Sequence, residues 1–190
     1  MQLHRRRSIM IAPMAFALTS ALPLGAFAQD STPAASESAA ISVIDLSPGV
    51  TAEVYAGAPS DRAPGQTVYV ARFVFQPGAE IFPHGHPGTT VLGVQSGSFG
   101  WTLVAGSARV VRGAAAGATE PTEILTEAGA DVVLAPGDAI YYEDDVIHTA
   151  RGAGDADAVV LGTLVLTAGQ PLLMTADQMA AMATAGTPSP

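Results

Sequence analysis

Glycine and proline recur along the whole of this chain, whose 190 residues include 20 Gly and 14 Pro. Both residues interrupt long helices and are common at the turns between short strands. Nearly half of the residues (48%) are apolar and only 13% are charged, so the chain carries enough apolar material for a substantial core. We therefore predict an all-β domain of many short antiparallel strands, arranged as a sandwich or a barrel.

Runs of β-branched and aromatic residues mark the expected strands. In the clearest run, from Thr67 to Gln76, Phe73 and Phe75 alternate with Arg72 and Val74. Further strands are predicted at 50–58, 89–95, 99–105, 109–112, 123–125, 131–134, 138–142, 146–151 and 158–167. The residues 96–98, Ser-Gly-Ser, predict a hairpin between two of these strands, and 109–112 is expected to extend the same meander.

One helix is expected near the C-terminus. Thr175 is followed three residues later by Gln178, which is the spacing of a capping box at the start of a helix. Met179 and Met182 supply the apolar side of the Ala-rich turns that follow.

The N-terminus is typical of a secretory signal peptide. Three Arg at positions 5–7 precede an apolar stretch from Ile9 to about Leu24, which ends at an Ala-Phe-Ala sequence before Gln29. We predict a signal peptide at 1–28, a disordered linker at 29–40, the folded domain at 41–184 and a frayed tail at 185–190. The protein is accordingly expected outside the cytoplasm, in the periplasm, on the cell surface or in the medium. The Sec and twin-arginine routes both remain open.

Composition excludes several classes of function. The chain contains no Cys, which excludes disulfides and thiolate metal sites. Once the signal peptide is removed, five Arg stand against 17 acidic residues, and nucleic acid is therefore not an expected partner. No second apolar run is long enough to span a bilayer.

Three histidines remain after cleavage. His84 and His86 are two residues apart, so on an extended segment both side chains point to the same side. His148 lies far along the chain, on another predicted strand. Three imidazoles gathered in this way suit a divalent transition metal ion.

The spacing around these histidines resembles the two motifs of the cupin superfamily. The first motif, G-x5-H-x-H-x3-4-E-x6-G, is matched by Gly78, His84, His86 and Gly97. The second, G-x5-P-x-G-x2-H-x3-N, is matched by Gly137 and His148. The resemblance extends roughly from residue 41 to 167. It implies a single cupin double-stranded β-helix, that is, a jelly-roll barrel, here followed by a short C-terminal helix.

The chain departs from these motifs at positions that matter for chemistry. Thr90 stands where the first motif has its Glu ligand, which leaves a site of three His. Gly152 stands where the second motif has Asn, a residue that this chain does not use anywhere. We interpret Gly152 as a compositional bias. A three-His site favours Fe, Cu, Zn or Ni over Mn. Glu80 is interpreted as a surface charge, with rotation into the site as the alternative.

Two classes of function remain open from the sequence. The first is a metal-dependent oxidoreductase of the dioxygenase type, because the cupins that break down thiols with dioxygen use three His. The second is a non-catalytic binding protein for a metal or a small ligand, and a site that has lost its metal is also compatible with the pattern. Thr90, Trp101 and Tyr142 are the candidates for lining a small-molecule pocket. No catalytic residue is assigned, and a homodimer remains open.

Overall fold

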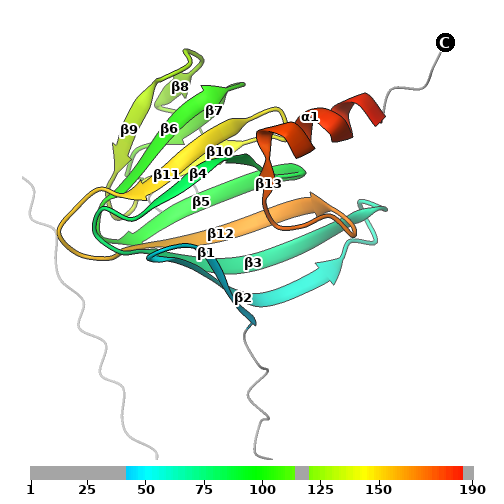
Figure 1. Ribbon diagram of the computed structural model, residues 1–190, viewed down its shortest axis with the longest axis horizontal. Helices are drawn as coiled ribbons and strands as arrows, with labels where there is room; N and C mark the ends of the chain where they lie inside the picture. Colours follow the sequence, from blue (N-terminus) through cyan, green and yellow to red (C-terminus); the bar gives the residue numbers. More distant parts are fainter. Residues whose placement is uncertain (1–41, 114–119, 186–190) are drawn as a thin grey trace, which may run out of the picture. The chain divides into compact units, whose positions relative to one another are not determined.

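The computed structural model describes residues 42–113 and 120–185, which form two antiparallel sheets and one short helix (Figure 1). The predicted signal peptide, the linker and the positions 186–190 of the predicted tail lie outside the described residues. So does most of the small-residue segment between Gly113 and Pro121. The fold class predicted from the sequence, all-β with a C-terminal helix, is confirmed.

The larger sheet has eight strands. In spatial order these are β1 (Ser42–Ser47), β2 (Val50–Pro59), β3 (Gln66–Phe75), β12 (Ala158–Thr167), β5 (Gly88–Ser96), β10 (Ala139–Tyr142), β7 (Ala108–Val111) and β8 (Glu123–Leu125). The smaller sheet has five strands, β13 (Met174–Thr175), β4 (Glu80–Gly85), β11 (Ile147–Gly152), β6 (Phe99–Ala105) and β9 (Asp131–Leu134).

Alternation along the strands places the apolar residues in one core. In β3, Ala71, Phe73 and Phe75 are buried, whereas Arg72 between them is partly exposed. The same pattern holds in β6, where Phe99, Trp101 and Leu103 are at most 1% exposed. The period of two therefore selects the inward residues of both sheets, as the sequence predicts.

The predicted hairpin at 96–98 is wrong, because β5 and β6 belong to different sheets. β5 pairs with β12 and β10, while β6 pairs with β11 and β9. The turn carries the chain from one sheet to the other. Gly97 adopts a φ of 73° there, and a Cβ would lie 2.3 Å from the Asp157 carbonyl oxygen. The predicted meander fails for the same reason, since β7 pairs with β10 and β8.

Gly152 is needed at this position for a steric reason. This observation replaces the interpretation of Gly152 as a compositional bias of the sequence. A Cβ at this position would lie 2.2 Å from the carbonyl oxygen of Gln76. The backbone of Gly152 also donates to the Ala79 carbonyl at 2.9 Å and accepts from the Gly78 amide at 3.0 Å. The end of β11 is thereby held against the segment that leads into β4.

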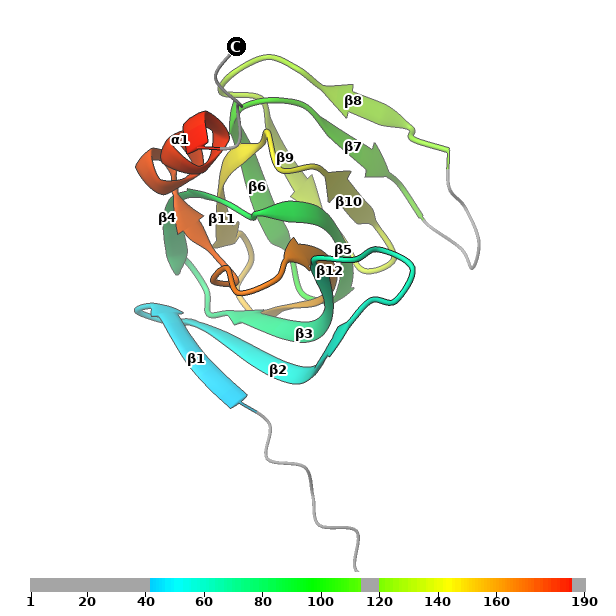
Figure 2. The same ribbon diagram turned by 90° about the vertical axis from the view of Figure 1, so that its right-hand side faces the viewer.

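The C-terminal helix α1 (Ala176–Ala185) begins at the predicted capping box. The Thr175 amide donates to Gln178 Oε1 at 2.8 Å, and the Gln178 amide donates to Thr175 Oγ1 at 3.3 Å. The helix packs beside β4 and β13, with Met179 buried (Figure 2). In the described part of the chain, no helix combines the length and the apolar character that a membrane span needs.

Candidate metal centre

The three histidines predicted as metal ligands lie together between the sheets. His84 is on β4, His86 follows the end of that strand, and His148 is on the adjacent strand β11, paired in register with His84. Their ring centroids are 4.2 Å (His84–His148), 5.2 Å (His84–His86) and 5.6 Å (His86–His148) apart. One nitrogen from each ring lies within 4.8 Å of the other two, and all three side chains are buried.

Backbone carbonyls fix the tautomers of two of these rings. His84 Nδ1 lies 2.8 Å from the Phe82 carbonyl oxygen, and His86 Nδ1 lies 2.7 Å from the Leu172 carbonyl oxygen. Because a carbonyl oxygen only accepts, each Nδ1 carries the proton and donates it. Each Nε2 therefore keeps its lone pair, which is the arrangement that a hydrogen bond from the other ring nitrogen imposes on histidine metal ligands.

His148 differs because neither of its ring nitrogens has a hydrogen-bond partner among the described residues. The ring is held by stacking instead, with its centroid 4.9 Å from that of Trp101 and the planes 19° apart. A buried imidazole without partners is costly, and a metal ion bound to one nitrogen would remove much of that cost.

Burial keeps all three imidazoles neutral. Loss of solvent lowers the pKa of His84 to about 4, and the Phe82 hydrogen bond offsets only part of this shift. Burial, followed by the nearby His84, lowers the pKa of His86 to about 3. Burial and the two neighbouring imidazoles hold the pKa of His148 well below its usual range. Neutral imidazoles are the form that coordinates a metal, so the three residues fit a divalent ion.

A cavity adjoins the rings. Its volume is about 20 Å³, measured as the space open to the centre of a water molecule, which is room for little more than one water. Besides the three His, its walls are apolar except for Tyr142, and they consist of Leu46, Phe73, Phe75, Ile81, Leu92, Phe99, Ala150, Val160 and Leu173.

The three residues predicted for the pocket are all buried, but only Tyr142 lines this cavity. Trp101 does not, because its ring stacks on His148 and packs 5.6 Å from the ring of Tyr142. Thr90 does not either, and it lies opposite Tyr142 in the pairing of β5 with β10. Thr90 Oγ1, Trp101 Nε1 and the Tyr142 hydroxyl all lack a hydrogen-bond partner within the described residues. With His148, these side chains form what we call the unpaired cluster.

Charged side chains stay outside the site. Arg72 pairs with Glu53 at 3.0 Å and Arg151 pairs with Asp131 at 2.7 Å, and all four side chains are partly or largely exposed. Glu80 is exposed, in agreement with its interpretation as a surface charge. Over residues 42–113 and 120–185, no carboxylate joins the cluster of the three His.

Sequence reasoning missed the groups that orient the ligands. The Leu172 carbonyl holds His86 from 86 residues away, and Leu46 and Leu173 close part of the cavity. No signal could have identified the Leu172 carbonyl, because every residue carries one and only the path of the chain selects it.

Comparison with solved structures finds cupins among the similar chains. A KdgF protein from Halomonas sp. shares 19% identity over 65% of this chain and 84% of its own, with a TM-score of 0.43. A cupin-superfamily protein from Desulfitobacterium hafniense shares 18% over 62% and 77%, with a TM-score of 0.40. An RmlC-like cupin from Shewanella frigidimarina shares 17% over 68% and 86%, with a TM-score of 0.36.

The two antiparallel sheets and the short C-terminal helix agree with the jelly-roll barrel that the sequence resemblance implies. His84 and His148 lie on adjacent strands and His86 follows the end of β4, while Thr90, at the place of the motif's Glu, lies on β5. No protein-family profile matches the chain, and no curated protein matches it.

Proposed function

We propose that this cupin is an exported protein that binds one divalent transition metal ion through Nε2 of His84, Nε2 of His86 and a ring nitrogen of His148. The observation that carries the proposal is the convergence of three buried, neutral imidazoles, one of which has no other partner. Without a carboxylate ligand, the donor set favours Fe, Cu, Zn or Ni over Mn.

The residues around the His define what the site offers to chemistry. A bound ion of this class supplies Lewis-acid or redox chemistry at the positions that the protein leaves open. Phe73, Phe75 and Phe99 make much of the cavity wall apolar, and Tyr142 contributes a hydroxyl to it. This arrangement supports a dioxygenase-type oxidoreductase that acts on a small molecule.

A second candidate is non-catalytic binding of a metal or a small ligand. It is favoured by the size of the cavity, which holds about one water and admits a substrate only if side chains such as Leu46 or Leu173 move. Oxygen uptake by the iron-loaded protein with a panel of small thiols and phenols separates the two candidates. Uptake that depends on His148 supports the enzyme, and no uptake with any compound favours binding.

The metal site itself is tested through Trp101, which is the one Trp of the chain and stacks on His148. Cu(II) should quench the Trp101 fluorescence at one equivalent, and a chelator should restore it. The alanine variants of His84, His86 and His148 should each lose most of this effect. Zn(II) at a hundredfold excess over its dissociation constant should also stabilise the intact protein by about 2.7 kcal/mol. If no ion quenches Trp101 or shifts thermal unfolding, the metal site is disproved.

Export is tested separately on the native protein. We expect cleavage after Ala28, so N-terminal sequencing should begin at Gln29. A native protein that begins at Met1 would contradict export without affecting the metal site.

A further inference from the structure

Three hydrogen-bond donors beside the histidines have no acceptor. Thr90 Oγ1, Trp101 Nε1 and the Tyr142 hydroxyl lack partners within the described residues, and these side chains are 0%, 0% and 1% exposed. Buried polar groups in folded proteins are nearly always paired, so three unpaired groups in one place require an explanation. A ligand that accepts hydrogen bonds provides one.

The three groups are neighbours of one another and of the metal ligands. Thr90 and Tyr142 are partners across β5 and β10, and the rings of Trp101 and Tyr142 are 5.6 Å apart. The Tyr142 ring is 4.9 Å from His148 and 5.9 Å from His86. Thr90 and Trp101 are thus both neighbours of Tyr142, but no hydrogen bond of ordinary geometry joins the polar atoms of the three side chains.

The chemistry of the three groups favours an anion as the missing acceptor. The indole N–H of Trp101 only donates, and the hydroxyls of Thr90 and Tyr142 are able to donate because no group among the described residues is hydrogen-bonded to them. The cavity lining contains no carboxylate. Three neutral imidazoles would leave the charge of a divalent ion uncompensated in an apolar cavity, which favours a negatively charged ligand over a neutral one.

We propose that Thr90, Trp101 and Tyr142 form a donor pocket that holds a small monovalent anion beside the metal ion, with Tyr142 as the principal donor because it also lines the cavity. This inference rests on the proposed metal site. The cavity of about 20 Å³ has room for little more than one water, so an anion of a few atoms, or the charged head of a larger molecule, enters only if Leu46 or Leu173 moves.

Azide provides a probe with a spectroscopic signal that does not depend on turnover. Full-length mature protein loaded with Cu(II) should bind azide and develop an azide-to-copper absorption band. Tyr142→Phe should weaken azide binding about tenfold, because the hydrogen bond that it removes goes to a charged group. The affinity of each variant for Cu(II) without azide is measured in parallel, so that a change in azide binding is separated from a change in metal binding.

Tyr141→Phe is the matched control. Tyr141 is the adjacent residue of β10, but its hydroxyl donates to Glu143 outside the barrel. This variant should bind azide as the unmodified protein does. Thr90→Val, which removes a second donor at nearly constant volume, should weaken azide binding in the same direction as Tyr142→Phe, and it serves as the test if Tyr142→Phe does not fold.

The experiment distinguishes failure of the donor-pocket proposal from failure of the metal-site proposal. If Cu(II) binds but azide does not, or if azide binds equally well to the unmodified protein, Tyr142→Phe and Thr90→Val, the donor pocket is disproved and the metal site stands. If Cu(II) does not bind at all, the proposed metal site is disproved and the donor pocket with it.

Discussion

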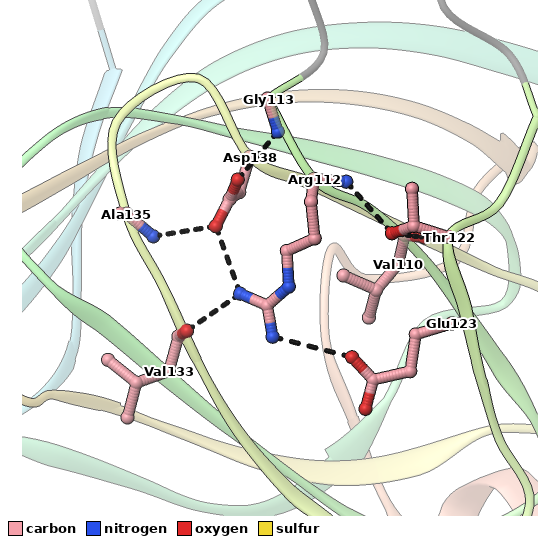
Figure 3. A network of polar contacts seen from close by, with 8 residues as sticks. All are labelled: Val110, Arg112, Gly113, Thr122, Glu123, Val133, Ala135 and Asp138. Carbon is pink, nitrogen blue, oxygen red and sulfur yellow. Dashed lines mark hydrogen bonds and ion pairs between the residues drawn. The ribbon is translucent and has the colours of Figure 1, made fainter.

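Two polar clusters in this domain differ in whether their polar atoms have hydrogen-bond partners. The unpaired cluster inside the barrel leaves polar atoms of Thr90, Trp101, Tyr142 and His148 without partners. The second cluster, here called the outer network, joins Arg112 and Asp138 near the surface (Figure 3). Asp138 accepts from the Gly113 amide at 2.8 Å, the Ala135 amide at 3.0 Å and Arg112 Nη1 at 2.9 Å.

In the outer network, polar groups are paired through hydrogen bonds and ion pairs that join neighbouring strands. Arg112 also donates to the Val133 carbonyl at 2.8 Å and pairs with Glu123 at 3.4 Å, so one side chain connects β7, β8 and β9. The unpaired cluster is more deeply buried, where unpaired groups cost the most. The proposed ligand of the donor pocket would account for this difference.

The largest expected effect is a loss of stability of the metal-free protein in mild acid. The folded-state pKa values of His84 and His86, about 4 and about 3, lie below the unfolded value of about 6.5, and that of His148 is also well below it. The unfolded chain therefore binds more protons as the pH falls below about 6.5. The free energy of unfolding should drop by up to about 4 kcal/mol per pH unit between pH 6 and 4, if all three residues contribute.

Urea unfolding at a series of pH values measures this slope, and His148→Phe should remove about a third of it. The outer network responds in a different range. Burial raises the pKa of Asp138, but hydrogen bonds from Gly113, Ala135 and Arg112 outweigh it and lower the pKa below the model-compound value of 3.8. Its contribution is present above about pH 4 and is lost only in stronger acid. A flat stability between pH 6 and 5 would contradict the assignment of neutral, buried His.

The second prediction places a carboxylate in the unpaired cluster. Thr90→Glu should destabilise the metal-free protein by about 3 kcal/mol, because an unpaired carboxylate is buried. Mn(II) should restore part of this loss and bind more tightly than to the unmodified protein, because a carboxylate suits a harder ion. Calorimetric titration and thermal unfolding measure the two effects.

Val91→Glu is the control for this substitution. Val91 is the next residue of β5 and is 42% exposed on the outer face, so the same charge there should change stability by about 0.5 kcal/mol or less. An equal Mn(II) affinity in Thr90→Glu and in the unmodified protein would mean that Thr90 does not face the metal.

The third prediction concerns the outer network. Asp138→Ala should cost about 2 kcal/mol, because the amides of Gly113 and Ala135 lose a charged acceptor. Glu123→Ala, which removes a half-exposed carboxylate from the same Arg112, should cost about 0.5 kcal/mol or less. Urea unfolding should separate the two variants, and equal costs would show that Asp138 does not organise the network.

The sequence predicted the parts of the site that depend on local spacing. His84 and His86 meet at one site because they are two residues apart on an extended segment, and the alternation over 67–76 predicted that Phe73 and Phe75 share one face, where both are buried. It did not predict the parts that depend on which strands meet. The pairing of β5 and β6 with other strands, the contact of Gly152 with Gln76 and the Leu172 carbonyl at His86 all join segments distant in sequence. Local patterns carry no information about such partners.

The smallest effect gives the most direct comparison, because it makes the same substitution in two environments. Thr90→Val removes a fully buried hydroxyl without a partner, and the metal-free protein should gain about 1 kcal/mol, since an unmet desolvation cost disappears. Thr102→Val removes a hydroxyl that donates to Asp131 at 2.5 Å and accepts from Arg151 at 3.2 Å, and this variant should lose about 0.5 kcal/mol. Urea unfolding of both variants in chelator measures the signs, which matter more than the sizes. If Thr90→Val destabilises the metal-free protein as Thr102→Val does, the Thr90 hydroxyl is paired in solution, and the unpaired cluster is then no different in kind from the outer network.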